Sequence, residues 1–247
     1  MKLRQRAILA LTIICVLVVA AMPAAATTRT VTLSAGTRYE TKMYIIDSGK
    51  PGPDVMIIGG VHGSEPAGYM AARQMKSWTP KRGRLIVLPE ANKPAVDQKR
   101  RVPSGGYDLN RAFPTYKGDT ANTYHARAIW SAMQRYGIDV LIDLHEGSNF
   151  HRVDSSSVGQ SIIYYPSTRA KAMAYQAYTT LNRKVSLSRE KFSLLRYPVK
   201  GSIARAAGQY LGIDAMIIET CTKNRLSERI DYHLTAVRTI LSYLGTR

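Results

Sequence analysis

The chain has 247 residues and a formal net charge of +18, with 35 Lys and Arg against 17 Asp and Glu. This length suffices for one domain with a sizeable apolar core, and two cysteines exclude a disulfide-rich scaffold. The positive charge suits an anionic surface such as a cell-wall polymer, although a basic surface without a specific partner explains it equally well. No nucleic-acid-binding motif is present, so we expect no nucleic-acid partner.

The first 26 residues have the pattern of a secretory signal peptide. A short basic segment precedes an apolar run at residues 7–22 and a small-residue cleavage site at residues 24–26. The run is shorter than the ~20 residues of a membrane span, so we expect cleavage instead of an uncleaved anchor. Residues 27–247 would then form a single secreted or cell-wall-associated catalytic domain without a transmembrane span. Cys221 is its only cysteine, which excludes an internal disulfide.

Strand-like and helix-like patterns alternate along the rest of the chain. Apolar runs between turn residues predict strands, and apolar residues at helical spacing predict helices. The expected strands are residues 31–33, 40–46, 55–58, 85–88, 140–145, 161–165 and 215–218. The expected helices are residues 66–78, 121–136, 168–183, 202–211 and 227–244, and the irregular segments are 90–115, 147–159 and 184–200. This alternation predicts an α/β fold with a mainly parallel, mixed central sheet and helices on both faces.

Three expected strands end in residues that bind metals or move protons. His62 and Glu65 follow one buried strand, His145 ends a second, and Glu219 ends a third. The carboxyl ends of parallel strands meet at one edge of a sheet, where binding crevices form. Two imidazoles and one carboxylate make a three-ligand zinc site with a fourth position left for water. We therefore expect one Zn²⁺ on His62, Glu65 and His145.

The chemistry of such a site needs a base, a cationic donor and a group that holds the substrate. Zinc lowers the pKa of its water to ~7, and Glu219 is the expected base because burial at a strand end would raise its pKa. Arg100 and Arg101 are candidates to stabilise the negative charge of a tetrahedral intermediate. Asn110 and Arg111 are suited to gripping a substrate carboxylate.

Four short motifs that contain these residues occur in order along the chain. They are His62-Gly63-Ser64-Glu65, Asp108-Leu109-Asn110-Arg111-x-Phe113-Pro114, Asp143-Leu144-His145 and Ile218-Glu219. Together they resemble the succinylglutamate desuccinylase/aspartoacylase family, a branch of the zinc carboxypeptidase superfamily. The resemblance extends over about residues 54–219 and implies a zinc-carboxypeptidase-like (phosphorylase/hydrolase-like) fold.

The resemblance also implies roles around the metal. It places zinc on His62, Glu65 and His145, with Glu219 as general base and acid. Asp108 matches an aspartate that supports a ligand histidine through the other ring nitrogen, which fixes the orientation of the ring.

Further implied roles concern the substrate. Asn110 and Arg111 match the pair that binds the carboxylate next to the scissile amide. Arg101 is the preferred oxyanion donor because of its place ahead of this pair, with Arg100 as the alternative. Tyr197 is the candidate for the tyrosine that, in zinc carboxypeptidases, folds over the bound substrate.

Two features depart from the family pattern. Glu146 follows the third ligand, where relatives often carry a small or hydroxyl residue, and it either points away or meets a cationic group of the substrate. The chain ends soon after Glu219, without the C-terminal domain that closes over the aspartoacylase site, so we expect a more open site.

Asp143 is either a support for His145 or a local contact. The other histidines lack ligand spacing and are expected at the surface (His125, His151 and His233).

The sequence thus predicts a secreted zinc-dependent hydrolase of the carboxypeptidase type. It would cleave an amide bond next to a free carboxylate, with cell-wall peptides as the expected substrates. One alternative is a deacylase of N-acyl amino acids, which is the commoner task in the family. The other is a metal-binding or peptide-binding module that does not catalyse.

Overall fold

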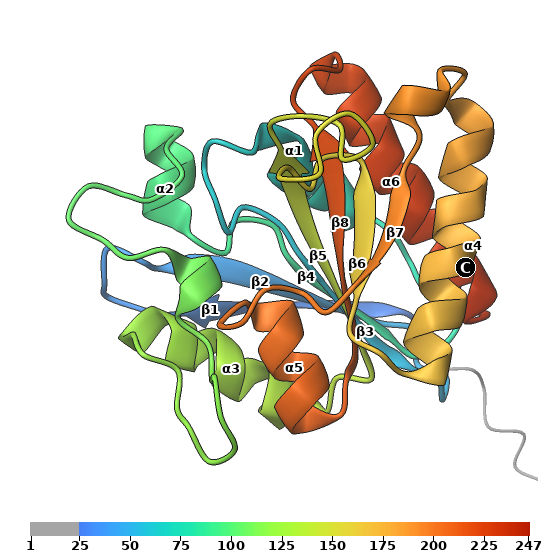
Figure 1. Cartoon of the computed structure of the whole chain (residues 1–247). Coiled ribbons are helices and arrows are strands. Elements are labelled where there is room, and N and C mark those ends of the chain that lie inside the picture. The colour runs from blue at the N-terminus through green and yellow to red at the C-terminus, as the bar shows by residue number, and fades with distance from the viewer. Residues whose placement is uncertain (1–24) are drawn as a thin grey trace, which may run out of the picture.

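An eight-stranded mixed sheet forms the centre of the computed structural model, which describes residues 25–247 (Figure 1). Its strand order is β1-β2-β4-β3-β5-β8-β6-β7. The strands are β1 (Thr27–Leu33), β2 (Thr41–Asp47), β3 (Asp54–Ile58), β4 (Arg84–Leu88), β5 (Val140–Gly147), β6 (Ser161–Tyr164), β7 (Ser193–Arg196) and β8 (Asp214–Cys221). The four central strands are parallel, whereas β2 and β6 run antiparallel to them. The expected mainly parallel, mixed sheet is confirmed.

Helices cover both faces of this sheet (Figure 1). One face carries α1 (Pro66–Met75), α4 (Thr168–Lys184) and α6 (Leu226–Tyr243); the other carries α3 (Tyr124–Tyr136) and α5 (Ile203–Leu211). The central strands contain continuous apolar runs because their side chains alternate between two cores: Val55 and Ile57 enter the first, and Met56 and Ile58 enter the second. Ser202 caps α5, since its hydroxyl accepts a hydrogen bond from the Arg205 N–H at 3.1 Å.

Two short elements lie in segments predicted to be irregular. Helix α2 (Lys93–Gln98) interrupts the expected loop at residues 90–115, and β7 lies within the expected irregular residues 184–200. Neither has a local pattern long enough to be recognised: α2 is a single six-residue helix, and β7 is a partly exposed edge strand. Two short 3₁₀ turns complete the structure, η1 (Leu109–Arg111) and η2 (Ser188–Glu190).

The expectation of surface histidines is wrong for two of the three. His125 and His233 are buried, and His151 is partly buried. His125 bonds the Ser34 hydroxyl at 3.0 Å and the Ala91 carbonyl, and burial lowers its pKa. Burial, together with the charge of His145, lowers the pKa of His233 to about 3. Segments that are distant in the sequence bury the rings of His125 and His233. The lack of ligand spacing around a histidine therefore does not tell whether its ring is buried.

The expected signal segment lies almost wholly outside residues 25–247, so it stays a prediction. Within that range, no helix combines the length and the apolar character needed to cross a bilayer.

Close packing at Gly63 positions the loop between β3 and α1. A Cβ at this position would lie 1.8 Å from the carbonyl oxygen of Ala95 in α2. The Gly63 N–H also donates to the Arg100 carbonyl at 2.9 Å. The loop that carries His62 and Glu65 is therefore fastened to the segment that leads to Arg101.

We expect Gly63→Ala to lower the free energy of unfolding by about 2 kcal/mol or more, because the new methyl group has no space beside Ala95. Urea unfolding of the purified variant measures this change. Ser64→Ala is the matched control, since Ser64 is exposed. Equal stability of the two variants would contradict the packing described above.

Candidate active site

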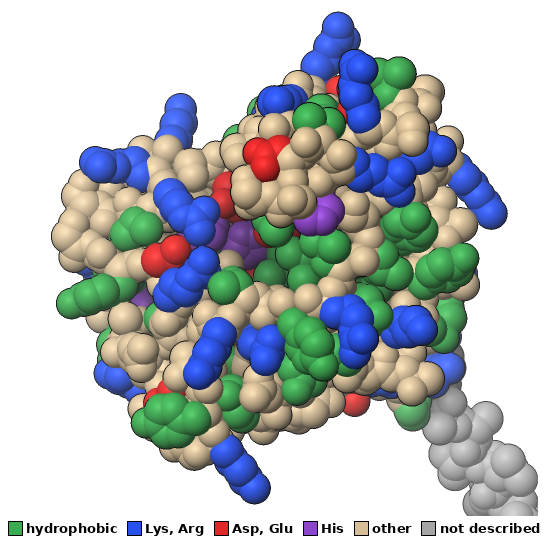
Figure 2. Space-filling view, viewed as in Figure 1, with side chains coloured by type: hydrophobic (Ala, Val, Ile, Leu, Met, Phe, Trp, Pro, Cys, Tyr) green, Lys and Arg blue, Asp and Glu red, His purple; other side chains and the backbone are tan. Residues whose placement is uncertain are grey.

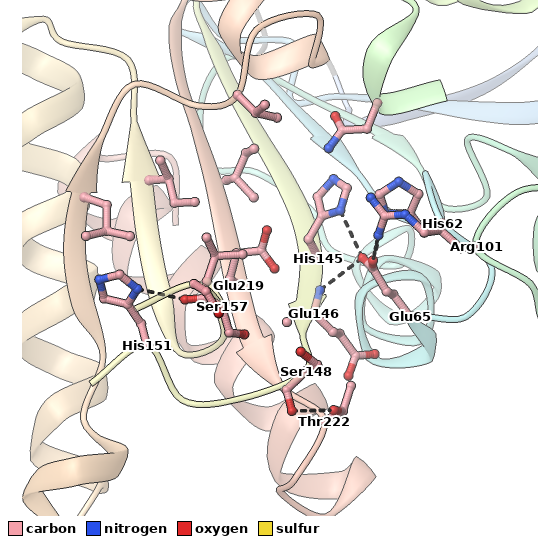
Figure 3. A pocket seen from close by; sticks show the side chains of 18 of the residues that line it. His62, Glu65, Arg101, His145, Glu146, Ser148, His151, Ser157, Glu219 and Thr222 are labelled. Atoms are coloured by element: carbon pink, nitrogen blue, oxygen red, sulfur yellow. Dashed lines mark hydrogen bonds and ion pairs between the residues drawn. The ribbon is translucent and has the colours of Figure 1, made fainter. Parts of the chain in front are cut away.

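A cluster of two histidines and one glutamate lies at the carboxyl ends of β3 and β5 (Figure 3). The Glu65 carboxylate lies between the imidazoles, 2.7 Å from His62 Nδ1 and 3.0 Å from His145 Nδ1. Local sequence explains this placement, because β3 ends at Ile58 and Pro66 occupies the first turn of α1. Glu65 takes the N-cap position of α1, but its side chain turns to the histidines instead of capping the helix.

An aspartate supports each imidazole from the opposite side. Asp108 lies 2.9 Å from His62 Nε2, and Asp143 lies 2.9 Å from His145 Nε2. When each Nε2–H is donated to its aspartate, each Nδ1 lone pair faces the centre of the cluster. The structure thus places Asp108 where the resemblance implies it. It also gives Asp143 the equivalent position at the second histidine.

The electrostatics of this cluster favour positive charge at its centre. Burial alone would raise the pKa of Glu65, but the charges and hydrogen bonds of His145 and His62 hold it well below its usual range. Burial would likewise lower the pKa of His145, but the charges of Asp143 and Glu65 outweigh it and raise that pKa well above its usual value. The pKa of Asp108 is lowered by His62 and Arg101 against the effect of burial.

These residues fit a metal ion by three separate criteria. One ligand atom from each of His62, Glu65 and His145 lies within 4.8 Å of the other two. All three residues are buried, so the ligand positions are fixed by packing. Two imidazole nitrogens and a carboxylate oxygen are a donor set suited to Zn²⁺, and the surroundings stabilise a cation, as the pKa shifts indicate.

Glu219 lies on β8 directly beside this cluster. Its backbone pairs with that of His145 in the parallel register of β5 and β8. The side chain is buried, and its Oε2 has no hydrogen-bond partner among residues 25–247. Burial raises the pKa of Glu219 to about 8, with a further contribution from the charge of Glu65 and opposition from His145. A group with this pKa can exchange a proton near neutral pH.

Arg101, and not Arg100, reaches the cluster. Its guanidinium lies 3.2 Å from Glu65 Oε1 and 3.3 Å from Asp108 Oδ2, and half of the side chain is exposed to the cavity and solvent. The Arg100 side chain instead donates to the Ser104 hydroxyl at 3.3 Å. Of the two candidates, only Arg101 lines the cavity.

Asn110 and Arg111, on η1, also line the cavity that the cluster borders. Asp108 caps this turn by accepting from the Asn110 N–H at 2.9 Å, so the residue that supports His62 also shapes this part of the cavity. The Asn110 side-chain oxygen is buried and unpartnered within the described part of the chain. Arg111 is exposed, and its guanidinium donates to the Asn110 carbonyl at 2.8 Å.

Glu146 points away from the metal ligands (Figure 3). Its carboxylate accepts from the Ala67 N–H in the first turn of α1 at 2.6 Å and pairs with Arg229 of α6. The side chain is fully buried, so it cannot meet a substrate. Of the two alternatives for Glu146, the structure therefore favours the orientation away from the site. Its backbone N–H still contributes, donating to Glu65 at 3.1 Å.

Tyr197 lies at the rim of the cavity, with half of its surface exposed. Its φ of 63° is unusual for a bulky residue, and such backbone strain is concentrated at functional sites. The ring packs edge-on against Tyr165, and the Arg196 and Arg205 guanidinium groups lie 5.3 and 5.0 Å from its centre.

The candidate metal ligands border one cavity of about 760 Å³, together with Glu219, Arg101, Asn110, Arg111 and Tyr197. Figure 2 shows histidine side chains inside this hollow and Lys and Arg side chains on the surface around it. The cavity also has a hydroxyl-rich wall, formed by Ser148, Ser155, Ser156, Ser157 and Thr222, and its serines belong to the polar segment expected at residues 147–159. The sequence did not predict the apolar wall, formed by Ile163, Leu195, Val199 and Ile217. Of these four residues, only Ile217 carried a local signal, since it precedes Glu219 by two residues and so shares its strand face.

Structures of known proteins share this fold. Tripeptide-bound cell shape determinant protein Csd4 from Helicobacter pylori superposes with a TM-score of 0.71 and 21% identity, covering 84% of this chain and 56% of its own. Succinylglutamate desuccinylase/aspartoacylase from Rhodobacter sphaeroides gives a TM-score of 0.65 and 20% identity, covering 90% and 65%. A putative metallopeptidase from Shewanella baltica gives a TM-score of 0.70 and 17% identity, covering 88% and 86%. The chain thus spans little more than half the length of Csd4, and at these identities the likeness concerns the fold.

Comparison with curated protein sequences gives no match. In contrast, a family model described as succinylglutamate desuccinylase/aspartoacylase catalytic domain matches residues 51–196, more than half of the chain. The matched residues include the three candidate metal ligands, whereas Tyr197 and Glu219 lie beyond them. The expected resemblance is confirmed: the chain belongs to the succinylglutamate desuccinylase/aspartoacylase catalytic domain family, a family of amide-bond hydrolases.

Proposed function

We propose that this protein is a zinc-dependent hydrolase of the carboxypeptidase type, which cleaves an amide bond next to a free carboxylate. The observation that carries the proposal is the position of Glu219 on the strand next to His145, where its side chain is buried and one of its oxygens has no hydrogen-bond partner within residues 25–247. A metal-binding module that does not catalyse has no need of this carboxylate.

The metal ligands and Glu219 have different roles in the proposed hydrolysis. His62, Glu65 and His145 would hold Zn²⁺, which would supply a Lewis acid and lower the pKa of a bound water. Glu219 takes a proton from the attacking water and passes it to the leaving amine. Its raised pKa makes the carboxylate a stronger base in the first step and keeps the proton available for the second.

Cationic and amide groups on the opposite wall bind the substrate. Arg101 lies beside Glu65 and faces the position where negative charge develops on the carbonyl oxygen. Asn110 and Arg111 hold the carboxylate next to the scissile bond, with the guanidinium as a two-pronged donor. Tyr197 covers the bound substrate from the rim.

A short peptide is the substrate class that suits the cavity best. Its volume of about 760 Å³ exceeds the need of a small N-acyl amino acid, and its apolar and hydroxyl-rich walls offer contacts for several residues. One structural relative, Csd4, is described as a D,L-carboxypeptidase. Without residues 1–26, which contain Lys2, Arg4 and Arg6 and no acidic residue, the net charge falls from +18 to +15. A secreted protein with this positive charge is attracted to anionic cell-wall material. We therefore include in the proposal cleavage of cell-wall peptides by residues 27–247, as one secreted domain.

Product analysis tests this choice of substrate. The zinc-loaded protein is offered stem peptides, dipeptides and N-acyl amino acids side by side, and mass spectrometry identifies the products. We expect release of a single C-terminal residue from peptides. The deacylase alternative rests on the desuccinylase and aspartoacylase activities for which the family is named. Exclusive turnover of N-acyl amino acids would favour this alternative over the peptidase.

Substitution of Glu219 separates catalysis from metal binding. We expect Glu219→Gln to reduce kcat/KM by about 10²- to 10⁴-fold, because the amide cannot accept the proton of water. Zinc content, measured by inductively coupled plasma mass spectrometry, stays at one ion per chain. Glu40→Gln is the control, since Glu40 lies at the surface. Undiminished hydrolysis in Glu219→Gln, or absence of zinc from the wild type, rules out the proposed mechanism.

The pKa of Glu219 also predicts how stability depends on pH. With its pKa raised to about 8 in the folded state, the native protein holds a proton that the unfolded chain has lost above its ordinary pKa of ~4.3. This contribution to stability is complete at low pH and is lost as the pH rises toward 8. In chelator-treated protein, Glu219→Gln should therefore be more stable than wild type by on the order of 2 kcal/mol at pH 8.

Urea unfolding of both proteins at pH 5, 6.5 and 8 measures this difference, which should shrink as the pH falls. The comparison between the two proteins cancels the titration of groups that do not interact with Glu219, such as His125. A difference that is constant with pH would show that Glu219 has an ordinary pKa.

A further inference from the structure

A second, smaller cavity of about 260 Å³ lies next to the proposed active site. Three tyrosine rings form much of its wall: Tyr39, Tyr107 and Tyr124. Tyr107 is 75% exposed and Tyr124 is 59% exposed, which is unusual for two large rings at one hollow. Tyr39 is held in place by stacking on His125, with 5.2 Å between ring centres and 17° between planes. The ring of Tyr39 is thus held in place, whereas the rings of Tyr107 and Tyr124 are exposed and available for contact with a ligand.

The polar groups of this cavity are neutral. Asn92 and Asn122 supply amides, and no Lys, Arg, Asp or Glu is among the described residues that line it. The Asn92 side chain is buried, and its oxygen has no hydrogen-bond partner within residues 25–247. His125 is not free to bind a ligand, because its two ring nitrogens already bond Ser34 and Ala91.

These groups restrict the chemistry of a ligand. An anion would find no cation in the lining. A cation could use the faces of the tyrosine rings, but the Arg38 guanidinium already lies 5.3 Å from the centre of the Tyr39 ring and repels a second positive charge. A purely apolar ligand would leave the side-chain oxygen of Asn92 without a partner. What remains is a neutral ring-shaped molecule with an apolar face for the tyrosines and hydroxyl or amide groups for the asparagines.

The two cavities share one segment of chain. Between Tyr107 and Arg111, alternate residues serve opposite sides: Tyr107 and Leu109 line the second cavity, whereas Asp108 supports His62 and Asn110 borders the first. A ligand in the second cavity therefore packs on the back of the segment that shapes the proposed active site.

We propose that the second cavity is a saccharide-binding subsite that takes one neutral pyranose ring. The ring would stack its C–H face on Tyr107 or Tyr124 and pair its hydroxyl or acetamido groups with Asn92 and Asn122. A sugar in this subsite and a peptide in the first cavity would belong to one substrate, a glycan that carries a peptide. This last step rests on the proposed function, whereas sugar binding itself does not.

Isothermal titration calorimetry with a tetramer of N-acetylglucosamine tests the subsite without any need for hydrolysis. We expect wild type and Glu219→Gln to bind the sugar equally. Tyr124→Ala and Tyr107→Ala should each weaken binding at least tenfold, and Tyr124→Phe should retain it, because the ring and not the hydroxyl provides the stacking surface. Tyr175→Ala is the matched control, since Tyr175 is 54% exposed on α4, at a distance from this cavity in the fold. Absence of binding to wild type, or unchanged binding in both alanine variants, overturns the proposal.

Kinetics then test the connection between the two cavities. For a stem peptide attached to its disaccharide, Tyr124→Ala should raise KM several-fold and leave kcat unchanged. For the free stem peptide, neither constant should change. Equal effects on both substrates would contradict the link while leaving the sugar-binding result intact. Failure of wild type to hydrolyse either substrate would count against the proposed function alone.

Discussion

The buried carboxylate of Glu65 is the constraint on which the rest of the site depends. An ionised carboxylate in a protein interior is strongly unfavourable unless charged and hydrogen-bonding partners surround it. Glu65 has such partners from three parts of the chain: His62 beside it, Arg101 ahead of η1, and His145 with the following N–H on β5. Because each partner comes from a different element, satisfying this one charge also fixes the relative positions of the β3–α1 loop, the Arg101 segment and β5.

Glu65 and Glu219 show that the partners of a buried carboxyl group decide whether its pKa falls or rises. Both are buried, which raises the pKa of each, yet the pKa of Glu65 lies well below its usual range and that of Glu219 is raised to about 8. Glu65 contacts two imidazoles directly, whereas one oxygen of Glu219 has no hydrogen-bond partner in the described part of the chain. Carboxyl groups with pKa values pushed apart in one site take different roles. A permanently ionised group suits a metal ligand, and a group that titrates near neutral pH suits a general base.

The sequence contained enough information for the sheet and for the centre of the site. Buried strands with continuous apolar runs are recognisable locally, and His62, His145 and Glu219 stand directly at or after the ends of such runs. Short elements such as α2, and the apolar wall of the cavity, depend on contacts between distant segments. The same holds for Glu146, whose partner Arg229 lies 83 residues away, and for the burial of His125 and His233. A single sequence does not record such contacts.

The residues of the proposed site differ in how firmly the fold holds them. The proposed metal ligands and base stand at the ends of central strands, where apolar cores on both faces hold the backbone. In contrast, most of residues 100–107 are exposed, and a backbone hydrogen bond from the Gly63 N–H to Arg100 holds the start of this segment. Hydrogen bonds at the surface open more readily than packed cores. The sheet thus sets the positions of the proposed metal ligands and base, whereas Arg101, the proposed oxyanion donor, belongs to an exposed segment with few packed contacts.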